Sequence, residues 1–371
     1  MKLKIAVLPG DGIGPEVTNQ AIKALNAIAD AFDHEFIYKE ALVGAIAIDE
    51  TGNPLPQETI EICEAADAIL FGSIGDPKYD NNPDAKVRPE QGLLALRKTL
   101  GLYTNIRPVK AYETLLEKSP LKTEFIKGVD FTIYRELTGG IYFGKKELSE
   151  DGKTASDLCE YSDYEIERIA HQAFKAALKR RKKLTLVDKA NVLESSRLWR
   201  RVVSEVSKEY PDVTLDFLFV DNAAMQMILN PKQFDVILTE NMFGDIISDE
   251  GSVIGGSIGL LASASIGDDS ALFEPIHGSY PQAKGQNIAN PIASILSAAM
   301  LLEQFEMVDE ANLVRQAVEK SLELKVSTPD LNKDNSFTTT RVGDFIAELI
   351  LNNEDFKINL DNLNLGQSTI I

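Results

Sequence analysis

Phe234-Asp-Val-Ile-Leu-Thr239 leads directly into Glu240-Asn-Met-Phe-Gly-Asp-Ile-Ile-Ser-Asp-Glu-Gly251, and these two segments decide the fold class. The first is a short, β-branched apolar run that predicts a buried strand. The second indicates the start of a helix, on which Asp245 and Asp249 stand four residues apart and project from one face. A strand followed at once by a helix is the repeating unit of α/β folds.

The same alternation continues on both sides of this unit. Further strands are predicted at residues 5–8, 68–71, 105–112, 130–143, 183–188 and 213–220. Helices are predicted at residues 15–32, 56–66, 92–100, 164–182, 195–209, 223–229, 291–305, 311–324 and 339–351. The pattern predicts an α/β fold in which largely parallel central sheets are flanked by helices.

The middle of the chain is richer in strands, because 105–112 and 130–143 follow each other with no clear helix between them. We therefore expect two domains. A discontinuous one on the cofactor side comprises residues 1–103 and 256–371, and an inserted one comprises residues 104–255. The polar tail 357–371 is expected on the surface.

Composition excludes several classes of function. The net charge of −19 and the pI near 4.7 argue against nucleic acid and anionic membrane as partners. Two cysteines, Cys63 and Cys159, have no disulfide or metal spacing and fit a reducing compartment. The N-terminus lacks the apolar segment of a signal peptide, and no apolar run approaches a membrane span. We expect a soluble cytoplasmic protein.

Acidic and basic side chains at strand ends suggest a metal and proton-transfer site. Carboxylates four apart on a helix are most often only a solvated face, but paired oxygen ligands also suit Mg²⁺ or Mn²⁺. Asp221 follows a predicted strand and is a candidate third ligand. Lys189 also stands at a strand's carboxyl end, where α/β active sites gather, and near a metal its pKa could fall far enough for proton exchange.

Three arginines lie where a charge needs a partner. Arg107 and Arg135 interrupt predicted strands, and Arg97 lies on a predicted helix. A guanidinium is costly there without an anion, so each is either a structural ion pair or part of an anion site. Converging on one site, the three would bind the carboxylates of a di-acid in bidentate fashion.

Two glycine-containing loops are candidates for nucleotide binding. Gly10-Asp-Gly-Ile-Gly-Pro15 follows a strand, but its glycines are one residue short of the dinucleotide fingerprint. A tight strand-to-helix turn with Pro15 in the first helical turn is the favoured interpretation. In the loop 273–291, Ser279, Asn287 and backbone N–H groups could hold phosphate oxygens, and His277 could cover a base. An ordinary surface loop is the alternative.

The order of these motifs resembles the β-decarboxylating dehydrogenases, the family of isocitrate and isopropylmalate dehydrogenases. The resemblance runs from residue 8 to about residue 345. It rests on Leu8-Pro-Gly-Asp-Gly-Ile-Gly-Pro-Glu16, Arg135-Glu-Leu-Thr-Gly-Gly-Ile-Tyr-Phe-Gly144, Asp188-Lys-Ala-Asn-Val-Leu193, Asn241-Met-Phe-Gly-Asp-Ile-Ile-Ser-Asp249 and Glu274-Pro-Ile-His-Gly278. It implies the two-domain fold of this family, which is not a Rossmann fold.

One segment points to the isopropylmalate branch. Isocitrate enzymes place hydroxyl and amide groups in the region of Arg88-Pro-Glu-Gln-Gly-Leu-Leu-Ala-Leu-Arg97, where this chain has Leu93 and Leu94. Two leucines could form an apolar wall for an isopropyl group and reject a third carboxylate. The resemblance therefore implies 3-isopropylmalate as the substrate, with its oxidative decarboxylation as the reaction.

The resemblance also implies roles at matching positions. The malate carboxylates would be bound by Arg97, Arg107 and Arg135. Mg²⁺ or Mn²⁺ would be held by Asp245, Asp249 and Asp221 of the partner subunit, which also lies against the substrate. The partner subunit's Lys189 would take the hydroxyl proton and Tyr142 would protonate the enolate, so the active unit would be a homodimer with shared sites.

NAD is the implied cofactor. The residues on its side would be Glu90, near the nicotinamide, and Glu274, His277, Gly278, Ser279, Gln282, Asn287 and Asn290. Gln282 departs from the family, whose NAD-preferring members usually have an aspartate there. A glutamine can accept a ribose hydroxyl bond but carries no charge to exclude NADP, so NAD is expected with weaker discrimination.

Two alternatives remain at this stage. A sister enzyme would act on another 3-substituted malate, such as homoisocitrate, malate or tartrate. A non-catalytic regulatory homologue would have lost the proton-transfer pair or metal ligands, whereas Lys189, Tyr142 and the three aspartates are all present.

Overall fold

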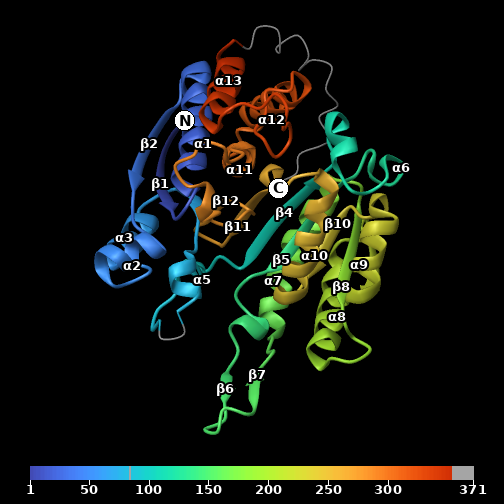
Figure 1. Ribbon diagram of the computed structural model, residues 1–371. Helices are drawn as coiled ribbons and strands as arrows, with labels where there is room; N and C mark the ends of the chain where they lie inside the picture. Colours follow the sequence, from blue (N-terminus) through green and yellow to red (C-terminus); the bar gives the residue numbers. More distant parts are fainter. Residues whose placement is uncertain (83–84, 353–371) are drawn as a thin grey trace. The chain divides into compact units, whose positions relative to one another are not determined.

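The computed structural model describes residues 1–82 and 85–352, and the predicted surface tail 357–371 lies outside the described residues. The chain forms two compact units (Figure 1). Of the described residues, unit 1 comprises Met1–Gly101 and residues 255–352, and unit 2 comprises Leu102–Ile254. Among the described residues, no helix has the length and apolar character needed to cross a membrane.

Unit 1 is built around a five-stranded sheet with the order β2-β1-β3-β12-β11. All neighbours are parallel except the antiparallel pair β11 and β12. Its strands are β1 Lys2–Gly10, β2 Glu35–Glu40, β3 Ala68–Ser73, β11 Ala262–Ile266 and β12 Ala271–Pro275. Its α-helices are α1 Gly14–Phe32, α2 Ala45–Thr51, α3 Gln57–Glu64, α4 Pro77–Asp80, α5 Pro89–Thr99, α11 Ile292–Gln304, α12 Val308–Glu323 and α13 Thr339–Leu351.

The core of unit 1 forms around α11. This helix is apolar on all sides, and every residue from Ile292 to Glu303 is buried. It packs against α1, α12 and the strands β11 and β12. A helix that is hydrophobic all round is stable only in such surroundings. The loop that precedes α11, at 276–291, is thereby held on the core.

The main-sheet strands of unit 2 pair in the order β4-β5-β10-β8-β9. β4 and β5 are antiparallel, and the remaining pairs are parallel. Its strands are β4 Thr104–Lys110, β5 Asp130–Glu136, β8 Lys183–Asp188, β9 Thr214–Phe219 and β10 Val236–Thr239, with a separate ribbon of β6 Lys146–Leu148 and β7 Ala155–Asp157. Its α-helices are α6 Thr123–Ile126, α7 Asp163–Lys179, α8 Glu194–Val206, α9 Val220–Leu229 and α10 Asn241–Ser252.

The two faces of this sheet are covered by different helices. Phe131 and Ile133 of β5 join Met227 of α9 and Ile247 of α10 in one buried cluster. Residues that alternate with them on β5, Thr132 and Tyr134, point to the opposite face because strand side chains alternate. On that side α7 packs against β5, β10 and β8, and also against α8 (Figure 1).

The prediction of an α/β fold with largely parallel sheets is confirmed, with several local corrections. The strand expected at 130–143 ends at Glu136, because Gly139 and Gly140 begin a turn of 3-10 helix, η2 Gly140–Tyr142. The segment between β4 and β5, expected to hold no helix, contains the 3-10 helix η1 Glu113–Lys118 and the short helix α6. The strands β2, β6, β7, β11 and β12 and the helices α2 and α4 were not predicted.

The segment between β1 and α1 is a tight strand-to-helix turn, as the favoured interpretation of its sequence predicts. Gly10 has φ +68°, and a Cβ built there would lie 2.0 Å from the carbonyl oxygen of Ser73. A Cβ at Gly12, φ +58°, would lie 2.0 Å from the carbonyl oxygen of Ser279. Asp11 accepts hydrogen bonds from the N–H groups of Ala45, Ile46 and Gly75. The glycines are thus required by the close approach of neighbouring backbone.

Candidate active site

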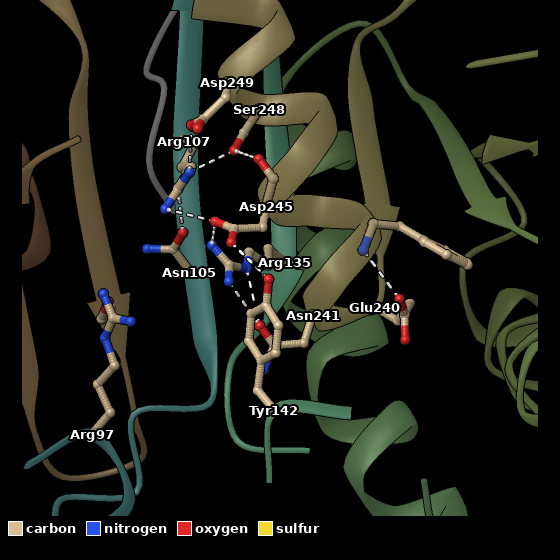
Figure 2. Close-up of polar contacts among 12 residues, drawn as sticks. Arg97, Asn105, Arg107, Arg135, Tyr142, Glu240, Asn241, Asp245, Ser248 and Asp249 are labelled. Carbon is tan, nitrogen blue, oxygen red and sulfur yellow. Dashed lines mark hydrogen bonds and ion pairs between the residues drawn. The ribbon is translucent and has the colours of Figure 1, made fainter. Parts of the chain in front are cut away.

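The two aspartates of the deciding motif lie on α10, at the carboxyl end of β10. The helix begins at Asn241, after Glu240, whose side chain accepts a bond from the N–H of Phe243. Asp245 and Asp249 follow four residues apart and turn to the same side of the helix (Figure 2). Asp249 is 66% exposed and Asp245 is 38% exposed, so both carboxylates are accessible.

Arg107 faces these carboxylates from β4 and is held by neutral groups. Its Nε donates to Asn105 Oδ1 over 2.7 Å, and its Nη1 donates to Ser248 Oγ over 2.5 Å. The carboxylates are more distant, with Nη2 3.9 Å from Asp245 and Nη1 3.5 Å from Asp249 (Figure 2). A nearly buried guanidinium is therefore fixed in direction by an amide and a hydroxyl.

Arg135 lies next to Arg107, on the adjacent strand β5. It forms an ion pair with Asp245 through Nη1, and its Nε and Nη2 donate to Asn241 Oδ1 over 3.1 and 2.9 Å. A Cβ at Gly244 would lie 2.6 Å from Arg135 Cγ, so the glycine lets the arginine pass along α10. The structure thus brings together two of the three predicted anion-binding arginines.

Tyr142 reaches the same cluster from η2. Its hydroxyl donates to Asp245 Oδ2 over 2.9 Å (Figure 2). The glycines before it are required by Tyr161: a Cβ at Gly139 would lie 2.8 Å from the ring, and one at Gly140, φ +74°, would lie 2.3 Å from the hydroxyl. The Thr-Gly-Gly-Ile-Tyr sequence therefore places the Tyr142 hydroxyl beside the aspartates.

The charges of this cluster move its pKa values in different directions. Burial by itself would raise the pKa of Asp245, but the charges of Arg135 and Arg107 and the Tyr142 hydrogen bond hold it below the ordinary value. Burial raises the pKa of Asp249, because the opposing effect of Arg107 is smaller. Burial and the charge of Asp245 raise the pKa of Tyr142 to about 12. Tyr142 is therefore a protonated donor at neutral pH.

The predicted metal ligands are only partly assembled in one chain. Carboxylate oxygens are the ligands that Mg²⁺ and Mn²⁺ prefer, and two face the same space on α10. Asp221, expected at a strand end, lies in the first turn of α9. Within the described residues of one chain, no group of three His, Cys, Asp or Glu side chains is placed to hold a metal. The carboxylate oxygens fit a hard cation. Of the three predicted ligands, Asp245 and Asp249 lie together on α10, and Asp221 lies on α9.

Lys189 and Asp221 form a pair of their own. Lys189 follows β8, and its Nζ donates to Asp221 Oδ1 over 2.7 Å. This bond holds the pKa of Asp221 below its ordinary value. The Lys189 side chain is 26% exposed and that of Asp221 is 68% exposed, so the pair lies at the surface of unit 2.

Unit 1 carries the other predicted substrate residues on α5. Glu90, Leu93, Leu94 and Arg97 follow at intervals of three and four residues and share one face of the helix. Leu93 and Leu94 are half-buried, whereas Leu96 belongs to the core. Arg97 is bonded to the buried Glu274 of β12, with 2.7 Å between Nη2 and Oε1. Glu274, predicted on the cofactor side, thus fixes an arginine.

The loop 276–291 is held by bonds to the N-terminal end of α1. Glu16 accepts from the N–H groups of Gly285 and Asn287, over 2.5 and 3.1 Å. Ile13 N–H donates to Ser279 O over 2.8 Å. The Ser279 hydroxyl and Glu90 Oε1 both lie near Gly75, because a Cβ built there would be 3.5 and 3.0 Å from them. The predicted residues Ser279 and Glu90 are thus neighbours in unit 1.

The remaining loop residues differ in how free their side chains are. Asn287 accepts from the N–H and the hydroxyl of Thr340, and Asn290 accepts from Ile292 N–H and donates to Asp330. Both amides therefore hold the loop on its surroundings. His277 Nε2 is buried and has no hydrogen-bond partner among the described residues, and burial lowers the pKa of this ring. Gly278 and Gln282 are exposed.

Comparison with known proteins identifies the family. The model of the isocitrate/isopropylmalate dehydrogenase family matches residues 4–346. The chain belongs to this family.

Relatives and solved structures of the family cover almost the whole chain. A 3-isopropylmalate dehydrogenase of Bacteroides fragilis is 56% identical over 352 residues, which is 94% of this chain and 99% of the relative. The Bacillus subtilis enzyme of the same name is 53% identical, over 92% and 95% of the two chains. The crystal structure of isocitrate dehydrogenase from Methylococcus capsulatus has a TM-score of 0.85 at 34% identity, covering 94% and 99%. A β-decarboxylating dehydrogenase from Thermococcus kodakarensis has a TM-score of 0.78 at 35% identity, covering 98% and 99%. The predicted family and fold are confirmed.

Several residues that build this isocitrate/isopropylmalate dehydrogenase site were missed in the sequence. Asn105 and Ser248 hold Arg107, Asn241 holds Arg135, and Tyr161 packs on the glycines before Tyr142. Asn241 and Ser248 stand inside the quoted motif, so their position was visible but their partners were not. Tyr161 lies in a loop with no local pattern that indicates a function.

Proposed function

We propose that this protein catalyses the NAD-dependent oxidative decarboxylation of (2R,3S)-3-isopropylmalate to 4-methyl-2-oxopentanoate, a step of leucine biosynthesis. The observation that carries the proposal is the face of α5, where half-buried Leu93 and Leu94 adjoin a fixed Arg97. An apolar wall beside an arginine suits a malate with a branched apolar substituent and penalises a further carboxylate. The relatives named 3-isopropylmalate dehydrogenase support the same substrate.

The basic residues bind and orient the substrate. Arg97, Arg107 and Arg135 bind the two malate carboxylates, which offer the bidentate partners that a fixed guanidinium fits. Asp245 and Asp249, with Asp221 of the partner subunit, would hold Mg²⁺ or Mn²⁺. When bound, this ion would supply Lewis-acid polarisation of the 2-oxygen, and bound NAD would supply the acceptor for the hydride of C2.

Two residues of the chain move protons. The partner subunit's Lys189 takes the proton of the 2-hydroxyl as the hydride leaves C2. Loss of CO₂ then leaves an enolate, to which the Tyr142 hydroxyl donates a proton at C3. The raised pKa of Tyr142 keeps this proton in place at neutral pH, and the bond to Asp245 orients it.

A homodimer is part of the proposal, because Lys189 bonds to Asp221, whereas Tyr142 and Arg135 bond to Asp245. The helices α9 and α10 pack on each other, and they and the residue after α10 carry apolar side chains that are 41–59% exposed: Met225, Ile228, Leu229, Ile246 and Val253. An apolar patch of this kind marks a protein interface. A second copy covering it would carry its own Lys189 and Asp221 to the site.

The reaction is tested by nicotinamide reduction with 3-isopropylmalate, isocitrate or malate and Mg²⁺. Metal-dependent turnover of 3-isopropylmalate above the other two acids supports the proposal, and turnover of malate or isocitrate alone contradicts it. Leu93→Ser should lower kcat/KM for 3-isopropylmalate about tenfold relative to malate. The matched control Ala95→Ser, at an exposed position of the same helix, should leave that ratio unchanged.

Subunit mixing tests the shared site. Lys189→Ala and Asp245→Asn should each be inactive alone. In a mixed dimer one site carries both substitutions and the other carries neither, so random reassociation should restore about a quarter of wild-type activity. Differently tagged chains show whether the subunits have exchanged. If the mixture stays inactive although they have, Lys189 and Asp245 act in the site of the same subunit, and the shared site is contradicted.

A further inference from the structure

Asn241, the first residue of α10, uses both ends of its side-chain amide. It is 1% exposed. Its Oδ1 accepts from Arg135 Nε over 3.1 Å and from Nη2 over 2.9 Å, and its Nδ2 donates to Gly139 O over 3.1 Å. Figure 2 shows this amide between Arg135 and Tyr142. One side chain thus bonds an arginine of the site and the loop that carries its tyrosine.

The backbone of Asn241 is fixed as well. A first-turn N–H has no acceptor within its own helix. Here it donates to the hydroxyl of Tyr161 over 3.0 Å. The Tyr161 ring packs edge-on against Trp199, with 5.4 Å between centroids, and it also lies close to Gly139 and Gly140. The backbone that carries the Asn241 side chain is therefore held in place by Tyr161.

Few residues could take this place. A planar amide has one oxygen acceptor and one nitrogen donor, held at a fixed separation. Aspartate offers an acceptor but no donor to Gly139, and alanine offers neither. Since Gly139 stands three residues before Tyr142, the Nδ2 bond fixes the start of the turn that aims the tyrosine hydroxyl at Asp245.

We propose that Asn241 is a positioning residue for both substrate binding and proton transfer. Its oxygen holds Arg135 in the orientation that binds a carboxylate, and its nitrogen holds the 137–144 loop in the orientation that presents Tyr142. The functional half of this inference rests on the reaction proposed above. The geometric half, that the amide orders the loop, does not.

Two substitutions separate the two bonds. Asn241→Asp keeps an oxygen for Arg135 but replaces the donor to Gly139 with a second oxygen. It should leave the KM for 3-isopropylmalate within about threefold and lower kcat about tenfold. Asn241→Ala loses both bonds and should raise that KM and lower kcat, each on the order of tenfold. The KM for NAD should not change in either variant.

The matched control is Gln20→Ala, which removes another buried amide. Gln20 lies in unit 1, and its Nε2 donates to Glu16 O over 3.0 Å. It should alter neither the KM for 3-isopropylmalate nor the exchange rates of the 137–144 loop. An effect equal to that of Asn241→Ala would assign both to a general loss of packing and overturn the proposal.

Hydrogen exchange supplies a readout independent of turnover. The amides of Gly139, Gly140 and Gly144 are bonded in the wild type. Peptides covering 137–144 should exchange about tenfold faster in both Asn241 variants and not in Gln20→Ala. Unchanged exchange in Asn241→Asp, or an equal KM rise in both Asn241 variants, overturns the proposal. If wild-type protein fails to turn over 3-isopropylmalate while exchange responds as expected, the reaction proposal fails and the positioning stands. If the Asn241→Ala variant does not fold, the exchange rates and KM of the Asn241→Asp variant decide the test.

Discussion

The fit of Tyr161 against the loop of Tyr142 leads to a quantitative prediction about Gly140. At φ +74° an alanine pays the steric cost of the left-handed region, about 1 kcal/mol. Its Cβ would also lie 2.3 Å from Tyr161 Oη and 2.7 Å from Cζ. Displacing a buried ring adds about 2 kcal/mol. Gly140→Ala should therefore lower the free energy of unfolding by about 3 kcal/mol.

Gly152 provides the matched control. It also has a positive φ, +68°, but a Cβ built there meets nothing within 4 Å. Gly152→Ala should lower the free energy of unfolding by only about 1 kcal/mol and leave kcat unchanged. Gly140→Ala should lower kcat on the order of tenfold, because Tyr142 is only two residues away.

Urea unfolding followed by tryptophan fluorescence measures the difference. Trp199 is the single tryptophan and packs on Tyr161 in unit 2, where both glycines lie. The expected gap between the variants is about 2 kcal/mol. Equal destabilisation would show that only backbone conformation matters and refute the steric argument. A stable Gly140→Ala with wild-type kcat would refute the role of the loop in placing Tyr142.

Further predictions concern the titrating groups, the cofactor and the dimer. Tyr142→Phe should lower kcat about a hundredfold at every pH from 6 to 10, since its pKa of about 12 keeps it protonated throughout; a new limb in the pH–rate profile would contradict this. The pKa of Asp245 is lower in the folded protein than in the unfolded chain. Its ionised form therefore stabilises the fold above the ordinary pKa of 3.8, and this stabilisation is lost as the pH falls through the lower folded pKa. The free energy of unfolding of Asp245→Asn should lack this loss on acidification, measured by acid unfolding. Gln282→Asp should raise the NAD-to-NADP ratio of kcat/KM at least tenfold through repulsion of the 2′-phosphate, measured by initial rates. Ile228→Asp, in the exposed apolar patch, should produce monomers in sedimentation and abolish turnover, whereas active monomers would contradict the shared site.

Local sequence patterns correctly predicted many of the helices and strands. The helix at 339–351 and the strand at 183–188 have clear 3.6-residue or continuous apolar patterns, and the structure places both at those residues. β11 was not recognised because Ala262-Ser-Ala-Ser-Ile266 consists mostly of small side chains, although every residue is buried in the structure. The strand expected to run to 143 stops at Glu136, and the chain then enters a 3-10 turn at Gly140, whose positive φ and close approach to the distant Tyr161 no local pattern indicated.

The sequence by itself determined the α/β class, the family and the identity of the charged residues, because these depend on residue types at fixed local spacings. Only the tertiary structure decided which groups meet. It paired Arg97 with Glu274, Lys189 with Asp221, and Arg135 with both Asp245 and Asn241. Each of these bonds joins positions 32 to 177 residues apart. No local pattern encodes such a pair, because it arises when the strands and helices pack and their ends come together.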